Sequence, residues 1–463
     1  MPSKALWHAE LALLPSGVVP RVLIEVEGER ISALTPDTDP PPSASRLPGF
    51  TLPGLANAHS HAFHRALRGR TQRERGDFWS WRRRMYELAG RLDPESYLAL
   101  ATAVYAEMTL AGVTAVGEFH YIHHDQEGRR YADPNEMGLA LAAAASKAGI
   151  RLTLIDTCYL RGDLKGRPLE GPQLRFGDGD ASTWAERVGK LQAGPTLRIA
   201  AGIHSVRTLH PGAMRQVASW AAERSAPLHL HLSEQRAEND ECLAVTGLTP
   251  AALADRCGVL GPRTTAVHAT CLSDDDIRRL GATRTTVCMC PTTERDLAEG
   301  IGPAAALATA GSPLCVGSDS HAVIDLFEES RALELDERLA SGRRGHHRPA
   351  ALLAAATTGG MAAIGWRDAG RLQTGALADF ATLDLGSPRL AGARPEDLID
   401  HVVFAATAAD VTHVVIGGRP VVEQRCHVAL GDVGQALAKA IRALDEPQPV
   451  EPASRPIPQR PRT

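Results

Sequence analysis

Eight short apolar runs, separated by longer stretches of helical period, constrain the fold of this chain more than any other feature. The runs cover residues 51–58, 113–119, 150–158, 197–203, 227–232, 264–268, 285–290 and 313–318. Helical periodicity lies between them at 94–111, 135–148, 211–225, 249–257, 273–280 and 303–311. Repeated βα units predict an α/β fold with a parallel sheet. Eight strands without a glycine-rich phosphate fingerprint favour a closed (β/α)8 barrel of the TIM type over an open doubly wound sheet.

The two ends of the chain have a different pattern. Residues 5–35 alternate apolar and polar side chains, with turn signals at Pro15 and Gly28, and a linker rich in Pro, Asp and Ser follows. Strand-like alternation returns at 375–385, 401–404 and 411–422. We therefore predict a small β-sandwich domain formed from residues 1–50 and 370–445, with the barrel at 51–369 and a disordered tail at 446–463.

Composition excludes several classes of protein. The net charge is −4 and no basic run is concentrated, so we expect no nucleic-acid partner. The N-terminus has no apolar signal-peptide core and no later run is long enough to span a bilayer, which predicts a cytoplasmic protein without a membrane partner. The eight cysteines form no CxxC pair, and we interpret most of them as buried thiols.

Histidine and aspartate side chains stand where the predicted strands end. They are His59 and His61 on the first strand, His229 and His231 on the fifth, His268 on the sixth and Asp319 on the eighth. Residues two apart on a strand share a face, so His59 and His61 can hold one metal ion, although a lone pair could arise by chance. Asp319 ends an apolar strand, where a carboxylate needs a partner. This favours a role for Asp319 as the ligand of a cation over a role as a helix N-cap.

The fifth strand leaves two alternatives for its metal ligand. His231 is nearer the strand end, so we favour His231 as the ligand and His229 as a buried neighbour, with the reverse kept open. Glu234 follows His231 by three residues and could carry a proton beside a metal-bound water. Its alternative role is a first-turn glutamate favoured by the helix dipole.

Four motifs together resemble the amidohydrolase superfamily in its mononuclear deaminase branch. They are HSH, HLSE, VHAT and GSDS, at the ends of strands one, five, six and eight. The resemblance implies one Zn²⁺ per subunit held by His59, His61, His231 and Asp319, with Glu234, His268 and Asp319 as catalytic residues. Strand four ends in Ile203-His204 rather than in the lysine of many two-metal members, which favours one metal.

Further stretches resemble the formimidoylglutamate deiminase family. They are HSHAFHRA, DFWSWRRRMY, GEFHYIHHD, IHSVRTL and HLSEQ. This resemblance implies hydrolysis of N-formimidoyl-L-glutamate to N-formyl-L-glutamate and ammonia, in histidine degradation. It also implies substrate contacts at Arg82, Tyr121, His204, Arg207 and position 64, where this chain has His64 in place of the expected glutamine.

The residues themselves partly support a dicarboxylate substrate. Planar arginine forks bind carboxylates bidentately, which suits Arg207 and one of the three arginines 82–84, although a basic run is usually a solvated helix face. Tyr121 could donate a hydrogen bond or only pack. We expect His120, His123, His124 and His321 to orient other groups, and Cys288 and Cys290 to be core thiols.

Two other functions are compatible with the sequence. The first is another deaminase of the same branch, acting on guanine, an adenosine derivative or a chlorotriazine. The second is a catalytically silent scaffold, which the intact HSH, HLSE and GSD motifs disfavour. A barrel with long loops offers surface for self-association, and we expect a homodimer.

Overall fold

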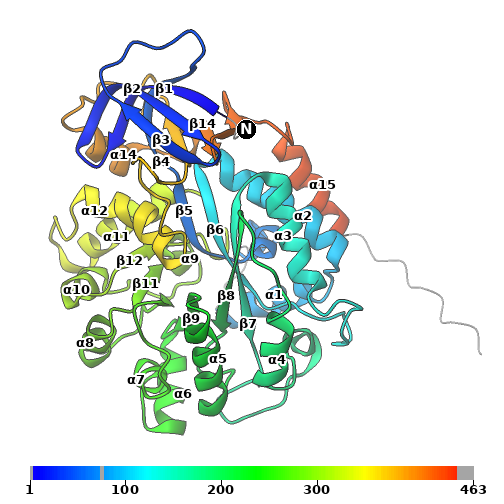
Figure 1. Cartoon of the computed structure of the whole chain (residues 1–463). Coiled ribbons are helices and arrows are strands. Elements are labelled where there is room, and N and C mark those ends of the chain that lie inside the picture. The colour runs from blue at the N-terminus through cyan, green and yellow to red at the C-terminus, as the bar shows by residue number, and fades with distance from the viewer. Residues whose placement is uncertain (1–3, 73–77, 446–463) are drawn as a thin grey trace, which may run out of the picture.

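The computed structural model of the chain describes residues 4–72 and 78–445, and Figure 1 shows two sheets within them. One is an eight-stranded parallel sheet in which each strand pairs with the next along the chain. It contains β5 (Leu55–Ser60), β6 (Val113–His120), β7 (Arg151–Cys158), β8 (Leu197–Ile203), β9 (Leu228–Leu232), β10 (Thr264–His268), β11 (Thr286–Met289) and β12 (Leu314–Val316). A parallel bridge between Ser60 and Asp319 joins the last strand to the first. The predicted (β/α)8 barrel is confirmed.

Helices cover the outside of this barrel. The larger ones are α1 (Phe78–Ala89), α2 (Pro94–Leu110), α3 (Glu136–Ala148), α4 (Ala181–Val188), α5 (Pro211–Glu223), α6 (Arg236–Thr246), α8 (Asp274–Ala282), α11 (Leu326–Ser341), α14 (Leu398–Ala405) and α15 (Val433–Asp445). The shorter ones are η1 (Ala62–Leu67), η2 (Gly171–Phe176), α7 (Pro250–Arg256), α9 (Pro291–Asp296), α10 (Ala304–Ala310), α12 (Pro349–Ala354), a π-helical turn at Ala355–Gly359, α13 (Gly360–Ala363) and η4 (Ala408–Asp410). No described helix is both long enough and apolar enough to cross a membrane.

The sequence sets the ends of these helices in ordinary ways. Asp93 accepts a hydrogen bond from the Ser96 backbone N–H and Pro94 occupies the first turn, which is a capping box at the start of α2. Gly149, with φ of 73°, ends α3 in the left-handed conformation that glycine adopts without strain. Such signals explain why the predicted helix limits agree closely with the observed ones.

The second sheet combines both ends of the chain. Its strands are β1 (Lys4–Leu14), β2 (Gly17–Glu27), β3 (Arg30–Thr35), β4 (Ser45–Pro53), β13 (Phe380–Leu383), β14 (Val411–Ile416), β15 (Arg419–Glu423) and β16 (Cys426–His427), in the order β16-β15-β14-β13-β4-β1-β2-β3. β4 runs parallel to β1 and antiparallel to β13, so it joins the N-terminal strands to the C-terminal ones. The expected pairing between the chain ends is confirmed.

Three predictions about local structure were wrong. Residues 51–58, expected to be one barrel strand broken at Pro53 and Gly54, belong to two strands, because Gly54 separates β4 of the second sheet from β5 of the barrel. The expected linker contains most of β4, whose Pro48 and Gly49 are residues typical of turns. Residues 401–404 belong to helix α14 rather than to a strand, since a short apolar run such as HVVF fits either period. The tail predicted at 446–463 lies outside the described residues.

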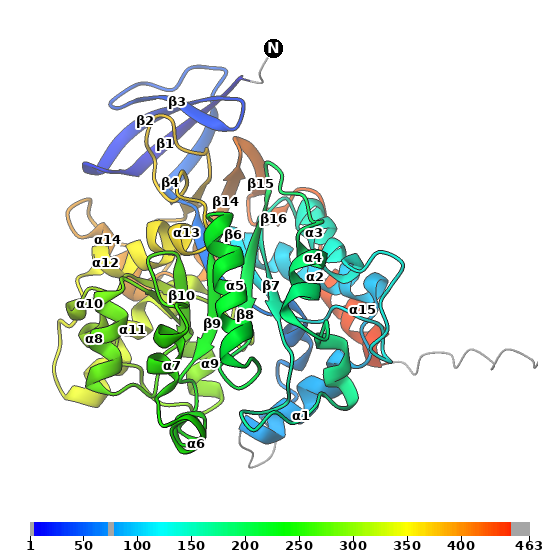
Figure 2. The ribbon, with the colours of Figure 1, turned by 60° about the horizontal axis from the view of Figure 1, so that its bottom comes forward.

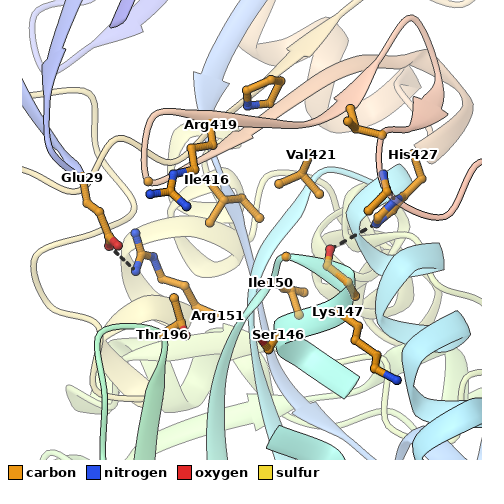
Figure 3. A pocket seen from close by; sticks show the side chains of 16 residues that line it. Glu29, Ser146, Lys147, Ile150, Arg151, Thr196, Ile416, Arg419, Val421 and His427 are labelled. Carbon is orange, nitrogen blue, oxygen red and sulfur yellow. Dashed lines mark hydrogen bonds and ion pairs between the residues drawn. The ribbon is translucent and has the colours of Figure 1, made fainter. Parts of the chain in front are cut away.

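The second sheet packs against the end of the barrel where the strands begin. Arg151, the first residue of β7, donates hydrogen bonds to Asp379 beside β13 at 2.7 and 3.1 Å, and it also contacts Glu29 at 3.1 Å. Figure 3 shows Arg151 and Glu29 at one side of a cavity between the two sheets, with His427 on the other. Both Arg151 and Asp379 are almost fully buried, so this end of the barrel is closed. The open end is the opposite one, which Figure 2 turns forward and where α1 and α6 lie.

Candidate metal centre and active site

Four side chains meet at the carboxyl ends of the barrel strands. His59 and His61 come from the end of β5, His231 from β9 and Asp319 from the loop after β12. One possible ligand atom from each lies within 4.8 Å of the others, and all four residues are buried. Nε2 of His59 and Nε2 of His61 lie 3.5 and 3.4 Å from the same Asp319 oxygen, Oδ1. The structure therefore brings together the four residues predicted as metal ligands.

Backbone carbonyls orient two of the three imidazoles. Nδ1 of His61 donates to the Phe119 carbonyl at 2.9 Å, and Nδ1 of His231 donates to the His204 carbonyl at 2.8 Å. Each ring consequently directs the lone pair of Nε2 into the cluster. Nε2 of His231 lies 3.1 Å from Nε2 of His59, a separation at which two lone pairs repel unless a proton or a cation lies between them.

The backbone around the cluster is specialised. A Cβ atom on Gly317 would come within 2.8 Å of His59, so only glycine allows the end of β12 to approach β5 this closely. Asp319 and His268 have positive φ angles of 41° and 69°, a conformation that side chains other than glycine rarely adopt. Strain of this kind is typical of functional sites, where it directs a side chain that a regular strand would place elsewhere.

Burial keeps the imidazoles of the cluster uncharged. It lowers the pKa of His59 to about 3 and that of His231 to about 4. Burial also lowers the pKa of His61 well below its ordinary value. Three neutral imidazoles and one carboxylate are a donor set that zinc takes in tetrahedral sites. The residues present therefore fit a divalent metal ion of this kind.

His229 lies outside this cluster. Its Nε2 donates to the Ala363 carbonyl at 3.0 Å, and the side chain is completely buried. Of the two histidines on β9, the structure thus places His231 in the metal cluster and His229 in the interior below it. This is the arrangement that the position of His231 near the strand end favoured.

A narrow cavity opens over the cluster. The residues that line it are His61, His64, Phe78, Trp81, Arg82, Met85, Tyr121, His204, Arg207, His231, Glu234, His268, Leu297 and Asp319. Every residue predicted as catalytic or substrate-binding is in this set, and His59 lies beneath it. The cavity combines the four-residue metal cluster, two guanidinium groups and one carboxylate outside that cluster, which is a composition typical of a hydrolytic site.

Helix α1 brings one arginine to the cavity. Arg82 faces it and donates from Nε to the Tyr86 hydroxyl at 2.7 Å, while Arg83 and Arg84 are exposed. The Arg82 guanidinium also lies over the Trp79 ring, 5.4 Å from its centroid. The basic run is therefore a solvated helix face at two of its three positions, and the third belongs to the cavity.

Arg207 is paired with two carboxylates. Its side chain is buried, Nε donates to Glu238 Oε1 at 3.3 Å, and one terminal nitrogen lies 3.9 Å from Glu234 Oε2. Glu238 Oε2 in turn accepts from the backbone N–H of Glu234 at 3.3 Å. Glu238 was not predicted, because at position three of helix α6 it has the pattern of an exposed first-turn residue.

Carboxylates surround His268. Nε2 lies 3.8 Å from Asp319 Oδ2 and 4.0 Å from Glu234 Oε1, whereas Nδ1 lies 3.4 Å from Glu294 and 3.6 Å from Glu299. Burial alone would lower the pKa of His268, but these four groups raise it well above its ordinary value. Glu294 and Glu299 were not predicted. The only signal for Glu294 was its place three residues beyond Pro291 at the end of β11.

His64, Tyr121 and His204 form the wall of the cavity next to the metal cluster. The Tyr121 hydroxyl lies 3.2 Å from His64 Nε2 and 3.6 Å from the Met85 sulfur, so Tyr121 both packs and hydrogen-bonds. The ring of His64 lies edge-on to Trp81, and burial lowers its pKa to about 3. A neutral His64 can donate one hydrogen bond and accept another.

The other histidines that were expected to orient neighbouring groups are buried away from the cavity. His123 contacts His120 at 3.3 Å and the Thr157 carbonyl at 2.9 Å, beside an Asp156–Arg187 ion pair. His321 contacts Ser60 and Ser318 at 3.1 and 2.9 Å, on the side of β5 away from the cluster.

The cysteines are free. Cys288 and Cys290 are buried in and beside β11, as predicted, and Cys426 is exposed.

Comparison with known proteins agrees with this geometry. Residues 50–421 match the model of the amidohydrolase family. The chain is 36% identical over 452 residues to the formimidoylglutamate deiminase of Pseudomonas aeruginosa, which covers 94% of this chain and 98% of that protein. It is 31% identical over 378 residues to the 8-oxoguanine deaminase of Pseudomonas aeruginosa, covering 79% and 81%.

A crystal structure of an amidohydrolase from Brucella melitensis superposes with a TM-score of 0.88. The two chains are 33% identical, and the match covers 96% of this chain and all of that one. The barrel and the second sheet are thus parts of one known architecture. The chain belongs to the amidohydrolase family, as a hydrolase that acts on C–N bonds.

Proposed function

We propose that this protein is a zinc-dependent deiminase that hydrolyses N-formimidoyl-L-glutamate to N-formyl-L-glutamate and ammonia. The observation that carries the proposal is the pair Arg82 and Arg207, which line one cavity with the His/Asp cluster but come from separate elements. The glutamate part of this substrate has two carboxylates, and an arginine fork is the side chain best suited to each. The similarity to the deiminase of Pseudomonas aeruginosa supports the same substrate.

The cluster would hold the metal ion that activates water for the reaction. His59, His61, His231 and Asp319 would hold the ion. Zinc bound by such donors lowers the pKa of water, so that a nucleophile is available near neutral pH. The orienting carbonyls of Phe119 and His204 fix the rings for this purpose.

Glu234 and His268 would handle the protons and the developing charge. The oxygen of water adds to the formimidoyl carbon, and Glu234 takes a proton from it. His268, whose Nε2 faces both Asp319 and Glu234, is placed to donate a hydrogen bond to that oxygen. Glu234 delivers this proton to the terminal imino nitrogen and then transfers the second proton of the same oxygen to that nitrogen, so that the C–N bond breaks with its electron pair on nitrogen, ammonia leaves and the carbonyl of the formyl group forms.

A flat aminoheterocycle is the competing substrate class, which the similarity to an 8-oxoguanine deaminase represents. Such a molecule lacks the paired carboxylates that Arg82 and Arg207 would bind. It would instead use the aromatic wall formed by His64, Trp81 and Tyr121.

Initial rates of ammonia release decide between the two classes. We expect a kcat/KM for N-formimidoyl-L-glutamate at least about 100-fold above that for 8-oxoguanine or adenosine, since two charge-assisted contacts distinguish the substrates. Chromatography should identify the product as N-formyl-L-glutamate. Arg82→Ala should raise KM, and Arg83→Ala, on the exposed face of the same helix, is the matched control. A preference for the heterocycle would refute the proposal.

A further inference from the structure

Glu299 is a buried carboxyl group on a loop where the neighbouring residues are exposed. It lies between α9 and α10, and its side chain is completely shielded, while Ala298 and Gly300 on either side are exposed. Ala298 and Gly300 have φ angles of 56° and 113°, so the backbone on both sides of Glu299 takes left-handed conformations. This geometry, which is strained at Ala298 but not at Gly300, turns Glu299 inward.

Two proposed catalytic residues lie beside this carboxyl group. Its Oε2 lies 3.6 Å from Nδ1 of His268, and one of its oxygens lies within 4.8 Å of a Glu234 oxygen. Glu294 Oε1 hydrogen-bonds with the same Nδ1 at 3.4 Å and also accepts from the Cys290 backbone N–H at 2.8 Å. Nδ1 carries one hydrogen, and Glu294 is the better-placed acceptor for it.

An ionised Glu299 would have no donor to stabilise it. Neither of its oxygens accepts a hydrogen bond from any described residue. A buried carboxylate without donors, beside two other carboxylates, is strongly unfavourable. Burial therefore raises the pKa of Glu299 well above its ordinary value and the charge of Glu234 raises it further, whereas a charged His268 lowers it by less. As a neutral acid, Glu299 needs an acceptor for its O–H, and the Glu234 carboxylate is within reach.

We propose that Glu299 is a positioning residue of the hydrolytic site, an uncharged carboxylic acid that donates its O–H to the Glu234 carboxylate while lying against Nδ1 of His268. It thus fixes the two residues that move protons and stabilise charge in the reaction. Glu299 does not line the cavity, so it acts on the substrate only through Glu234 and His268. The roles given to these two residues rest on the proposed function.

Replacement by glutamine and by alanine separates this role from a merely structural one. A glutamine amide keeps the shape and a hydrogen-bond donor, so Glu299→Gln should retain kcat within about threefold. Glu299→Ala removes the donor and should lower kcat about 10- to 100-fold, with KM changed less than about threefold. Asp296→Asn, which removes a partly exposed carboxylate three residues earlier, should leave both constants unchanged. Zinc content and melting temperature are measured for each variant.

A spectroscopic signature tests the neutral acid without reference to activity. Protonated carboxylic acids have a carbonyl stretch well separated from that of carboxylates. The infrared difference spectrum of the wild-type protein minus Glu299→Gln, at neutral pH, should contain one protonated-acid band. Loss of a carboxylate band instead would overturn the proposal, as would a Glu299→Ala variant with wild-type kcat. A Glu299→Gln variant impaired as strongly as Glu299→Ala would also overturn it, because a charge would then be required.

Failure of the proposed substrate is distinguishable from failure of this inference. If wild-type protein releases ammonia from a heterocycle rather than from N-formimidoyl-L-glutamate, the same kcat comparison is made on that substrate. If Glu299→Ala does not fold, the infrared spectrum and the kcat of Glu299→Gln still decide the question.

Discussion

Replacing Arg207 with methionine tests the substrate assignment most directly. The guanidinium of Arg207 is buried at the cavity wall, where it contacts Glu238 at 3.3 Å and Glu234 at 3.9 Å. Methionine fills a similar volume without charge or donors. The change therefore removes the proposed carboxylate contact with little loss of packing.

The size of the effect follows from the contacts. A bidentate arginine–carboxylate pair contributes two charge-assisted hydrogen bonds of about 1.5–3 kcal/mol each. Losing both costs about 3–6 kcal/mol, and every 1.4 kcal/mol is tenfold, so kcat/KM should fall about 10²- to 10⁴-fold. Most of the loss should be in KM, because the contact is made in both ground and transition states.

Removing Arg207 also leaves Glu238 unpaired, and this effect must be measured separately from the loss of substrate binding. Without Arg207, Glu238 is a buried carboxylate close to Glu234, which could disturb the proposed proton carrier. The double variant Arg207→Met/Glu238→Gln removes that uncompensated charge. If substrate binding is the main role of Arg207, the double variant should keep the raised KM of Arg207→Met but recover the wild-type kcat.

A small amidine provides the control. Formamidine has the reacting group of N-formimidoyl-L-glutamate without its carboxylates, so Arg207→Met should change kcat/KM for formamidine by less than about threefold. Initial rates of ammonia release with both substrates measure this. An equal loss on both substrates would refute the assignment and show that Arg207 acts only through Glu234.

Four further predictions concern the metal and stability. Glu234→Gln should keep the metal but lose at least about 100-fold in kcat, and near-wild-type turnover would remove Glu234 from the mechanism. Chelation should abolish ammonia release and lower the melting temperature, with zinc restoring both; an unchanged melting curve would contradict a resident ion. Burial raises the pKa of Glu118 from 4.5 to about 8, so the folded protein binds one proton more than the unfolded chain in this window and loses stability as pH rises through it. The free energy of unfolding of Glu118→Gln, measured with urea at several pH values, should lack this pH dependence. An equal dependence on pH in the wild type and the variant would exclude the contribution of Glu118. Asp379→Ala leaves Arg151 with the half-exposed Glu29 as its remaining carboxylate partner and should cost about 3 kcal/mol in the same assay; a loss below about 1 kcal/mol would show that Glu29 compensates.

The barrel could be predicted because its strands are buried on both faces and are read as continuous apolar runs between helices. The limits of β8 and β10 were predicted to the residue. The strand β4 could not be predicted, since its stability comes from pairing with β1 and β13, which lie far apart in sequence. The run at 401–404 shows the related difficulty that local periodicity does not distinguish a short strand from a helix.

The residues of the candidate site also include some that could be predicted from the sequence and some that could not. His59, His231 and Asp319 could be predicted because parallel strands of a barrel end at one rim, so sequence positions translate into proximity. Glu238 and Glu299 could not, because a helix first turn and a loop give no sign of facing inward. For Glu299 the deciding feature is the left-handed backbone on either side of it, which is a property of the folded chain.

The seam of the barrel has a consequence for biosynthesis. β12 reaches β5 through the bridge between Ser60 and Asp319, and Asp319 is also the fourth member of the metal cluster. A ribosome that has released the chain only as far as β11 has presented three imidazoles but no carboxylate to complete the set. The cluster is therefore complete only after ring closure, and a chain that ends before β12 lacks its carboxylate member.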